Sequence, residues 1–451
     1  MSILYTAKKT ITQHVNGGNM LIVATILALI CANLPGVKEY YSDFWNQTVA
    51  LQIGDFNLFS HNGHSMSMMQ FINDALMAVF FFTIGLEIKR EVLVGELASF
   101  KKALLPIIGA FGGMIVPVVI FMIEGHNSDF IGGAAIPMAT DIAFSLGVLA
   151  MLGNRVPVSL KIFLTTLAVV DDIGGIIVIA LFYSTSIDYM LLVYAFAILG
   201  VLLLGSKFHI QSKIFYLVLG GVVWFLFLNS GIHPTIAGVL VAFCIPATPV
   251  HPPKNYIATI RERISHFPAV NDDDLNTKTL LTSEQMNWLK EIESSSDKVI
   301  SPLQELEDSL HPIVNFFIIP LFAFANAGIF LGDMDITSVF EGVSLAVMSG
   351  LFIGKFTGIF LFSWAAIKMK LAPMPQLGNF KMLASISMLG GIGFTVSLFI
   401  ANLSFGSMGV HGLELLNNSK LGIILGSLFS GIVGYIMLNK TLPKEPLAED
   451  E

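Results

Sequence analysis

Residues 161–183 read KIFLTTLAVVDDIGGIIVIALFY, an apolar run with two adjacent aspartates near its middle. A helix of about 20 apolar residues, rising ~1.5 Å per residue, crosses the hydrocarbon core of a bilayer. A carboxylate at that depth costs roughly 2.5–3.5 kcal/mol on insertion scales, so Asp171 and Asp172 are hard to explain as structural residues. A soluble buried helix with salt-bridged aspartates is the alternative. The run favours a cation or proton site inside a membrane protein.

The composition of the whole chain also indicates a membrane protein. Hydrophobic residues make up 54% of the 451 residues and charged residues only 12%, whereas about 25% of the residues in an ordinary soluble protein are charged. The mean hydropathy is +0.76. The two cysteines, Cys31 and Cys244, both lie in apolar runs and indicate neither a disulfide framework nor a metal site.

Apolar runs along the chain predict an all-α polytopic membrane protein with twelve transmembrane helices. No small-residue cleavage site follows the first run, so we expect an uncleaved first helix rather than a signal peptide. The predicted spans are 20–34, 68–88, 103–123, 130–152, 157–183, 189–205, 214–228, 232–245, 310–331, 339–367, 382–401 and 421–437.

These spans divide the chain into four parts. Residues 1–246 hold spans one to eight, 247–309 form a polar cytoplasmic insert, 310–438 hold spans nine to twelve, and 439–451 form a cytoplasmic tail. Three consecutive aspartates at 272–274 admit a regulatory cation site. Because the insert is polar and rich in charge, a solvated, partly disordered loop is the stronger expectation.

The distribution of lysine and arginine predicts the orientation. If the N-terminus is cytoplasmic, fifteen Lys and Arg residues outside the insert fall on the inner side. Only Lys38 and Lys420 fall on the outer side, and Lys355 remains inside a span. Cytoplasmic loops of membrane proteins carry the excess of positive charge. Both termini are therefore expected in the cytoplasm.

Two of the predicted spans are interrupted. Residues 131–141 read IGGAAIPMATD, with Gly132, Gly133 and Pro137 followed by Thr140 and Asp141. Residues 389–395 read LGGIGFT, where the interrupting residues are Gly390, Gly391, Gly393 and Thr395. The interruptions fall in the middle of two three-span groups, spans 3–5 and 10–12. Because the groups start seven spans apart, they insert in opposite orientations.

Inverted repeats with broken helices place backbone carbonyls and helix ends around a substrate site at the bilayer midplane. We therefore expect two discontinuous helices that cross at mid-membrane. The crossing brings like ends of helix dipoles together, so Asp141 could offset the positive ends and Lys355 the negative ends. Lys355 lies too deep in its span to reach water, and Asp171 or Asp172 is its candidate partner.

Six stretches of the sequence resemble the bacterial NhaA-type Na⁺/H⁺ antiporters, a family that is itself a known example of inverted repeats. The resemblance as a whole extends over nearly the whole chain except the insert, and these stretches carry it. They read NDALMAVFFFTIGLEIKRE (73–91), ATDIAFSLGVLA (139–150), VPVSLKIFLTTLAVVDDIGGIIVIALFY (156–183), PLFAFANAG (320–328), IGKFTGI (353–359) and GGIGFTVSLFIA (390–401).

The resemblance implies roles for residues at matching positions. Asp171 and Asp172 would bind Na⁺ or Li⁺ and carry protons, with Asp172 as the direct ligand. Thr140 and Asp141 would lie in the unwound crossing, and Lys355 would pair with the first aspartate. The positions implied in the pH response are Glu87, Arg90, Glu91, Glu307 and His311 at the cytoplasmic entrance, and His233 elsewhere.

The resemblance also implies a protein of the bacterial inner membrane that works without a cofactor or nucleic acid and forms a homodimer. Two features depart from the family. The insert before Glu307 is longer than expected, and Asp308 stands where a histidine often follows that glutamate. Both departures concern the pH response rather than the central aspartates.

The residues predict the transport chemistry. Na⁺ and Li⁺ are hard cations that prefer oxygen ligands. Two neighbouring buried carboxylates cannot both ionise cheaply, so cation and protons compete for the pair. Alternating exposure of such a site to the two sides of the membrane is antiport. With Lys355 also available, more than one proton per Na⁺ would make the exchange electrogenic.

Two other classes of membrane protein are open alternatives. An intramembrane aspartyl protease could use Asp141 with Asp171, but its Gly-x-Gly-Asp signature has no aspartate here, since the glycine-rich span reads GGIGFT. A cation channel is the second alternative. Channels usually repeat their filter residues symmetrically across subunits, whereas this chain carries one asymmetric set of charges around a lysine.

Overall fold

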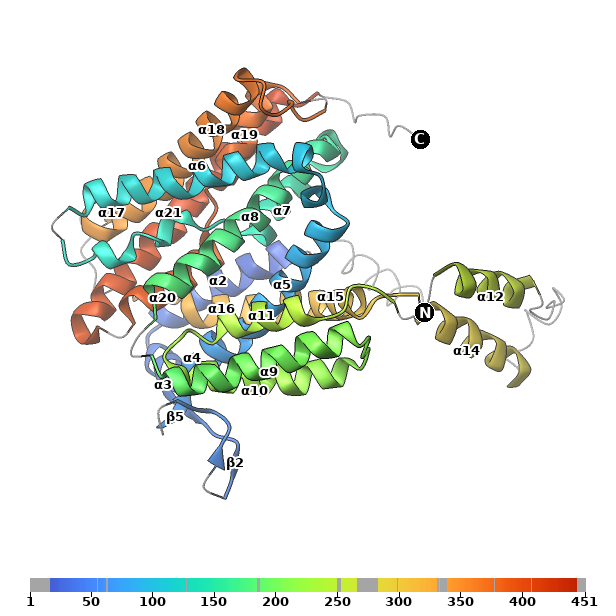
Figure 1. The fold of residues 1–451 in the computed structure, drawn as a ribbon. Coiled ribbons are helices and arrows are strands. Elements are labelled where there is room, and N and C mark those ends of the chain that lie inside the picture. Colours follow the sequence, from blue (N-terminus) through green and yellow to red (C-terminus); the bar gives the residue numbers. More distant parts are fainter. Residues whose placement is uncertain are drawn as a thin grey trace, which may run out of the picture.

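The computed structural model describes residues 17–443, except 55, 62–63, 127, 185–186, 250–252, 266–282, 298, 331, 333–338, 377 and 407. The described part is almost entirely helical, and its long helices pack into one bundle (Figure 1). The strands are short and lie between the first two predicted spans. They are β1 (Thr48–Val49), β2 (Gln52–Ile53), β3 (Phe56–Asn57), β4 (Ser60–His61) and β5 (His64–Ser67), paired antiparallel as β1–β5, β4–β5 and β2–β3.

Two of the candidate spans before the insert, Met68–Leu93 and Ile131–Met151, combine α-helix with π-helical or 3-10 turns. In chain order, the helices before the insert are α2 (Gly17–Asn33), α3 (Lys38–Asn46), α4 (Met68–Gln70), η1 (Phe71–Leu76), α5 (Met77–Leu93), η2 (Glu96–Ala98), α6 (Phe100–Glu124), η3 (Ile131–Gly133), η4 (Ile136–Met138), α7 (Ile142–Met151), η5 (Gly153–Arg155), α8 (Val158–Phe182), α9 (Tyr189–Lys207), α10 (Lys213–Ser230) and α11 (Thr235–Cys244).

Two amphipathic helices lie in the insert, and the remaining helices follow it. They are α12 (Pro253–Ser265), α14 (Ser283–Asp297), α15 (Pro302–Ile313), η6 (Val314–Ile318), α16 (Ile319–Asn326), α17 (Gly342–Ser349), η9 (Gly350–Lys355), α18 (Phe356–Lys368), α19 (Phe380–Leu389), α20 (Phe394–Phe405) and α21 (Gly409–Thr441). Among the short segments before and after the insert, η1, η6 and η9 are π-helical turns.

Nine helices of the described residues are long and apolar enough to cross a membrane, or eleven if each of two bent pairs counts as one span. The bent pairs are α2 with α3, at 111°, and α19 with α20, at 44°. The apolar helix α11 has ten residues, fewer than the roughly 20 that a straight span needs. The chain is thus an all-α protein built like a polytopic membrane protein, and the count of twelve spans stays a prediction.

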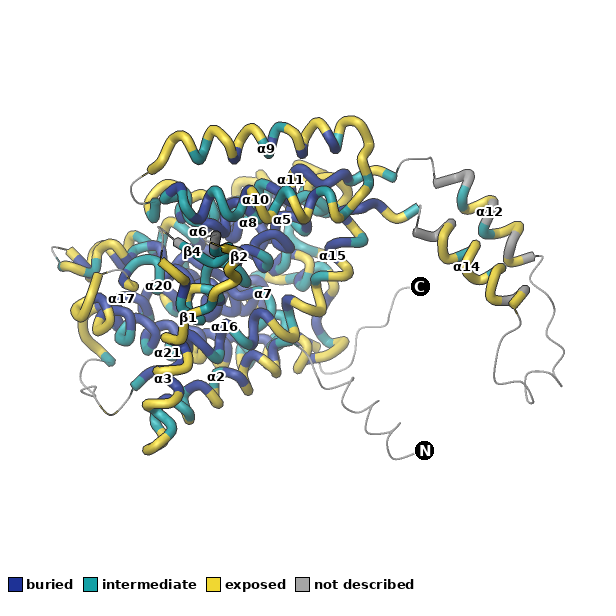
Figure 2. The backbone as a smooth tube through the Cα atoms, turned by 90° about the horizontal axis from the view of Figure 1, so that it is seen from below, coloured by how far each residue is buried: buried dark blue, intermediate teal, exposed yellow. Residues whose placement is uncertain are grey.

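Large apolar side chains cover the outside of the bundle, as expected where lipid is the solvent. On α9, Met190, Val193, Tyr194 and Phe196 are all exposed, and the outward side of this helix is exposed along its length (Figure 2). The buried residues lie toward the centre of the bundle. This distribution is the opposite of a soluble protein, in which such a large exposed apolar surface would promote association.

Close backbone contacts between helices position the central lysine. A Cβ on Gly112 of α6 would lie 2.3 Å from the carbonyl oxygen of Gly358 on α18, so α6 and α18 approach more closely than any side chain would allow. Small residues at such interfaces are typical of membrane helices. Segment η9, which directly precedes α18, packs against α6 in the same region, and Lys355 at its end is fully buried.

The structure corrects three expectations about segments outside the central spans. The insert contains α12 and α14, which pack against each other beside the bundle (Figure 1), so its described part is helical rather than a loop, and most of its described side chains are exposed. Helix α15 begins at Pro302, because Ser301 and Gln304 cap its first turn, so residues 302–309 belong to a helix rather than to the insert. The aspartates at 272–274 lie outside the described residues. Helix α3 and the strands occupy much of residues 37–67, between the first two predicted spans.

Lys420 is the third correction. Helix α21 begins at Gly409 rather than at Leu421, and Lys420 is buried within it instead of lying in an outer loop. Residues 411–420 read HGLELLNNSK and are too polar to indicate a span by composition. They pack against the rest of the bundle, where Leu415 and Leu416 are buried in the hydrophobic core.

Candidate functional site

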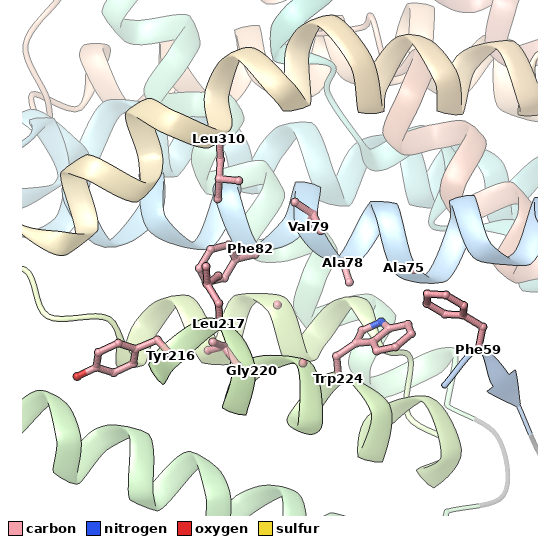
Figure 3. A pocket seen from close by; sticks show the side chains of 13 residues that line it. Phe59, Ala75, Ala78, Val79, Phe82, Tyr216, Leu217, Gly220, Trp224 and Leu310 are labelled. Carbon is pink, nitrogen blue, oxygen red and sulfur yellow. The ribbon is translucent and has the colours of Figure 1, made fainter. Parts of the chain in front are cut away.

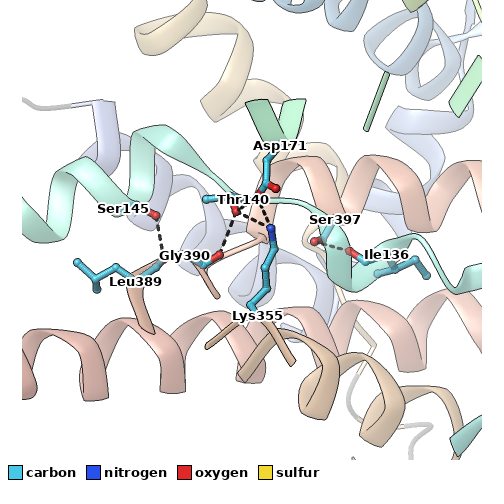
Figure 4. A network of polar contacts seen from close by, with 8 residues as sticks. All are labelled: Ile136, Thr140, Ser145, Asp171, Lys355, Leu389, Gly390 and Ser397. Atoms are coloured by element: carbon cyan, nitrogen blue, oxygen red, sulfur yellow. Dashed lines mark hydrogen bonds and ion pairs between the residues drawn. The ribbon is translucent and has the colours of Figure 1, made fainter. Parts of the chain in front are cut away.

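The two interrupted stretches meet in the structure and hydrogen-bond to each other (Figure 4). Residues 139–141 are non-helical between η4 and α7, and residues 390–393 separate α19 from α20. The backbone N–H of Asp141 donates to the carbonyl of Ile392 at 2.6 Å. Three hydroxyls add side-chain hydrogen bonds across the crossing: Thr140 to the carbonyl of Gly390 (3.0 Å), Ser145 to that of Leu389 (3.2 Å) and Ser397 to that of Ile136 (2.8 Å).

The glycines at the crossing allow backbone segments to touch. A Cβ on Gly391 would lie 2.5 Å from the carbonyl oxygen of Leu351 and 2.6 Å from Ser430 Oγ, and a Cβ on Gly390 would also clash. On Gly393 it would lie 2.3 Å from Ser397 Oγ. In the other interruption, at residues 131–141, the predicted residues differ in how closely their neighbours pack against them. Gly133 is crowded by Phe405, and Pro137 packs on Gly350, but nothing lies within 4 Å of a Cβ on Gly132.

Gly391→Ala is therefore expected to destabilise the protein by about 1–3 kcal/mol, the usual range for overpacking, because its methyl group meets a backbone carbonyl that cannot rotate away. Thermal unfolding in detergent measures the effect. Gly200→Ala on α9 is the matched control, since open space surrounds that position. Equal melting temperatures for the two variants would contradict the close contact at Gly391.

Asp141 lies at the N-terminal ends of two helices. Its Oδ1 accepts from the N–H of Phe144 in the first turn of α7, at 2.9 Å. Its Oδ2 accepts from the N–H of Thr395 at 3.1 Å and from Thr395 Oγ1 at 2.6 Å, at the start of α20. A carboxylate there satisfies unpaired N–H groups and offsets the positive ends of both dipoles. Asp141 occupies the position that the sequence suggested for dipole compensation.

Lys355 and Asp171 form an ion pair in which both side chains are fully buried. The ammonium also donates to Thr140 Oγ1 at 2.8 Å, and Thr140 directs its single hydroxyl hydrogen between Asp171 Oδ2, at 2.6 Å, and the more distant carbonyl of Gly390. Lys355 therefore contacts Thr140 and Asp171 rather than the carbonyl ends of the broken helices. It ends the π-helical turn η9, a geometry found frequently at functional sites.

Asp172 is 6% exposed and makes no hydrogen bond or ion pair with any residue that the structure describes. The Oδ1 atom of its neighbour Asp171 is fully buried without a partner. Native structures rarely leave buried polar atoms unpaired, and the exceptions call for a functional reason. The two aspartates thus offer unoccupied oxygen ligands beside the Lys355 ammonium. In the described ranges, no group of three or more His, Cys, Asp or Glu is arranged to hold a metal ion, so hydroxyl and backbone oxygens would have to complete a cation site.

Comparison with known proteins identifies the family. The model of the family described as Na⁺/H⁺ antiporter 1 matches residues 8–438. This chain belongs to that Na⁺/H⁺ antiporter family. A relative named Na(+)/H(+) antiporter NhaA from Phocaeicola vulgatus is 52% identical over 450 residues, covering 100% of this chain and 99% of the relative. Relatives with the same name are 53% identical in Bacteroides fragilis (98% and 100% covered) and 43% identical in Helicobacter pylori (96% and 95% covered).

Three of the residues implied in the pH response of this antiporter family join α5 to α15. Arg90 Nε lies 3.1 Å from Glu307 Oε1, and its Nη2 lies 3.1 Å from Glu91 Oε1. Glu87, one turn earlier on α5, is half-buried and interacts electrostatically with Glu307 and Arg90. His311 is exposed on α15, where its ring lies 3.1 Å from the amide of Asn315. The structure thus groups four of the five entrance residues.

His233 belongs to a different part of the antiporter. Its Nε2 lies 3.5 Å from Asp74 Oδ1, its Nδ1 lies 2.9 Å from Thr235 Oγ1, and its ring meets Phe399 edge-on at 5.2 Å. Asp74 precedes Arg90 by 16 residues in the same span, which is roughly 24 Å along a helix. Sequence reasoning missed Asp74, although a carboxylate inside the predicted span 68–88 was a signal of the same kind as Asp171.

A separate cavity of about 350 Å³ lies between α5, α10, α11 and α15 (Figure 3). Phe82, Trp224 and Leu310 are among its lining residues, and no charged residue lines it. Trp224 Nε1 donates to the carbonyl of Asp74 at 3.0 Å, so its polar atom is already satisfied. This mostly apolar cavity offers a cation no carboxylate ligand, so the candidate ion site of the antiporter is the crossing with its buried aspartates.

Proposed function

We propose that this antiporter exchanges Na⁺ or Li⁺ for H⁺ at Asp171 and Asp172. The observation that carries the proposal is the buried Asp172 carboxylate, unpaired among the described residues, next to the ion pair of Asp171 with Lys355. Membership of the antiporter family supports Na⁺ and H⁺ as the exchanged ions, since the relatives are named for them. The unpaired carboxylate oxygens support Asp171 and Asp172 as the place where these ions bind.

Competition for the same oxygens couples the two ions. A desolvated carboxylate without a countercharge is strongly disfavoured, so in the empty site Asp172 holds one proton, whereas Asp171 is ionised against the Lys355 ammonium. Na⁺ supplies the missing countercharge, favours the ionised form of Asp172 and expels its proton, while Thr140 and carbonyls of the crossing complete the ligands of the cation. When Asp171 turns to the cation, Lys355 loses its ionic partner in a buried site and releases a proton too. Two protons then leave as one Na⁺ binds, and the exchange moves net charge.

Alternating access requires the broken helices to face each side of the membrane in turn. We propose twelve spans, with α11 as a short eighth span, and two inverted repeats, spans 3–5 and 10–12, whose discontinuous helices cross at mid-membrane. Rocking of this pair of repeats against the other spans would expose the site alternately. Both termini would be cytoplasmic in a bacterial inner membrane, and two copies would form a homodimer.

The residues at 87, 90, 91, 307 and 311 would adjust the exchange to cytoplasmic pH, and His233 with Asp74 would act near the other end of the same span. The cation channel and the aspartyl protease find no support, because the relatives over the full length of the chain are antiporters. A flux assay separates the three classes, since a channel gives uncoupled current and a protease gives no flux.

Exchange in proteoliposomes is expected to be electrogenic. With more than one H⁺ moving against each Na⁺, an inside-negative potential should accelerate proton entry and Na⁺ exit several-fold compared with clamped zero potential. Na⁺, Li⁺ and K⁺ are compared in the same assay by following internal pH, with K⁺ expected to be inactive. Rates that do not respond to the potential would rule out the unequal stoichiometry while leaving antiport intact.

A further inference from the structure

Three asparagines form a hydrogen-bonded chain that connects three helical segments. Asn326 Nδ2, at the end of α16, donates to Asn73 Oδ1 of η1 at 2.9 Å. Asn402 Nδ2, on α20, donates to Asn326 Oδ1 at 2.9 Å. The second hydrogen of each donating amide goes to a carbonyl of its own helix, that of Phe322 at 3.0 Å or Leu398 at 2.8 Å. The chain therefore has one defined direction, and Asn326, at its centre, is fully buried.

The chain crosses the boundary between the repeats and the rest of the protein. Asn402 lies on α20, in the second repeat, whereas Asn73 and Asn326 lie on spans two and nine, outside both repeats. One turn earlier on the same two helices, the rings of Phe322 and Phe399 lie 6.4 Å apart. Consequently the Asn402–Asn326 bond spans the boundary, while the Asn326–Asn73 bond lies wholly on one side of it.

All three asparagines lie toward the outer side of the proposed topology. Asn73 precedes α5 and Asn326 ends α16, whereas Arg90 and Glu307 of the entrance cluster lie toward the opposite ends of the same two spans. Asn402 is likewise near the end of α20 that points away from the crossing. The asparagine chain therefore lies at the outer end of the boundary between the second repeat and the other spans. On the same helix, α20, Thr395 lies nearer the crossing, where it hydrogen-bonds to Asp141.

We propose that Asn402 is a positioning residue that holds the outer route to the ion site shut by donating to Asn326. This inference rests on the proposed rocking of the repeats. When α20 moves away from α16, the Asn402–Asn326 bond must break, and both amides then need water as partners. Since a buried amide left unpaired is strongly disfavoured, the bond exchanges for water only as the outer route opens and is hydrated.

The test uses Asn402→Ala in proteoliposomes whose insertion orientation has been determined, with Na⁺ varied on one face at a time. Loss of one hydrogen bond should raise the outward-open population, so the half-saturating Na⁺ concentration should fall roughly 2- to 10-fold at the outer face. It should rise at the inner face, by up to about twofold. A merely structural defect would not move the two values in opposite directions.

Two further asparagines supply matched controls. Asn46→Ala removes an exposed amide on α3 whose partner is the carbonyl of Ser42 in the same helix, so it should change neither value. Asn73→Ala removes the bond that does not cross the boundary. It should shift the ratio of the outer to the inner half-saturating Na⁺ concentration less than Asn402→Ala does. Asn402→Ser, whose hydroxyl is too short to reach Asn326, repeats the test if the alanine variant fails to fold.

Unchanged values in Asn402→Ala, or values that change in the same direction at both faces, would overturn this role of Asn402. A different result overturns the function itself. If the unmodified chain exchanges no Na⁺ for H⁺ in the same vesicles, the proposed antiport at the aspartate pair fails, and the role of Asn402 fails with it.

Discussion

Asp172→Asn is expected to abolish Na⁺-driven proton movement in everted membrane vesicles, with a loss of roughly 100-fold or more. Asp172 is buried and, among the described residues, makes no hydrogen bond or ion pair, so its carboxylate is free to serve as a ligand. The asparagine keeps the size but not the charge. Without this countercharge, a cation in a site shielded from water loses several kcal/mol of binding free energy, and every 1.4 kcal/mol lowers its affinity tenfold.

Recovery of a pH-sensitive dye after Na⁺ addition measures this exchange. Asp188→Asn is the matched control, because the same substitution falls at an exposed cap of α9, where the amide oxygen still accepts from the backbone. Asp172→Glu should retain measurable exchange with a weaker apparent affinity, since it keeps the charge but displaces it. Near-normal exchange in Asp172→Asn would remove Asp172 from the site.

Lys355→Met is expected to lower the free energy of unfolding by about 3–5 kcal/mol, the usual effect of removing one partner from a buried ion pair. The methionine fills much of the space of the lysine stem, so the loss comes from charge rather than volume. Asp171 would keep only the hydrogen bond from Thr140 while its Oδ1 has no partner. Thermal unfolding of the purified protein should show the loss as a markedly lower transition temperature.

The double variant Lys355→Met with Asp171→Asn separates charge from packing. Because it removes both charges, it should recover a large part of the lost stability, as expected for coupled neighbours. Lys440→Met, at an exposed position near the end of α21, is the control and should stay within about 0.5 kcal/mol of the unmodified chain. If the double variant is no more stable than Lys355→Met, the ion pair does not explain the loss.

Much of the helical architecture was predictable from local patterns. Apolar runs longer than about 15 residues predict membrane helices, because burial of an apolar helix in lipid depends on composition along the chain and hardly on its neighbours. The same patterns failed at polar helices. Residues 302–309 and 409–420 are helical through capping and packing, and α12 of the insert is polar, so hydropathy did not reveal these segments.

The amino-acid sequence by itself determined that acids and a lysine lie inside apolar spans, and which family the chain belongs to. Only the tertiary structure decided with which residues these buried acids and the lysine interact. Asp171 and Asp172 are neighbours in sequence but point about 100° apart on a helix, so the rotation of α8 against α6 and η9 selects Asp171 for Lys355. The Asn73–Asn326–Asn402 chain joins residues more than 70 positions apart. Such contacts depend on how the helices pack against one another in the folded protein, and no local sequence pattern encodes that packing.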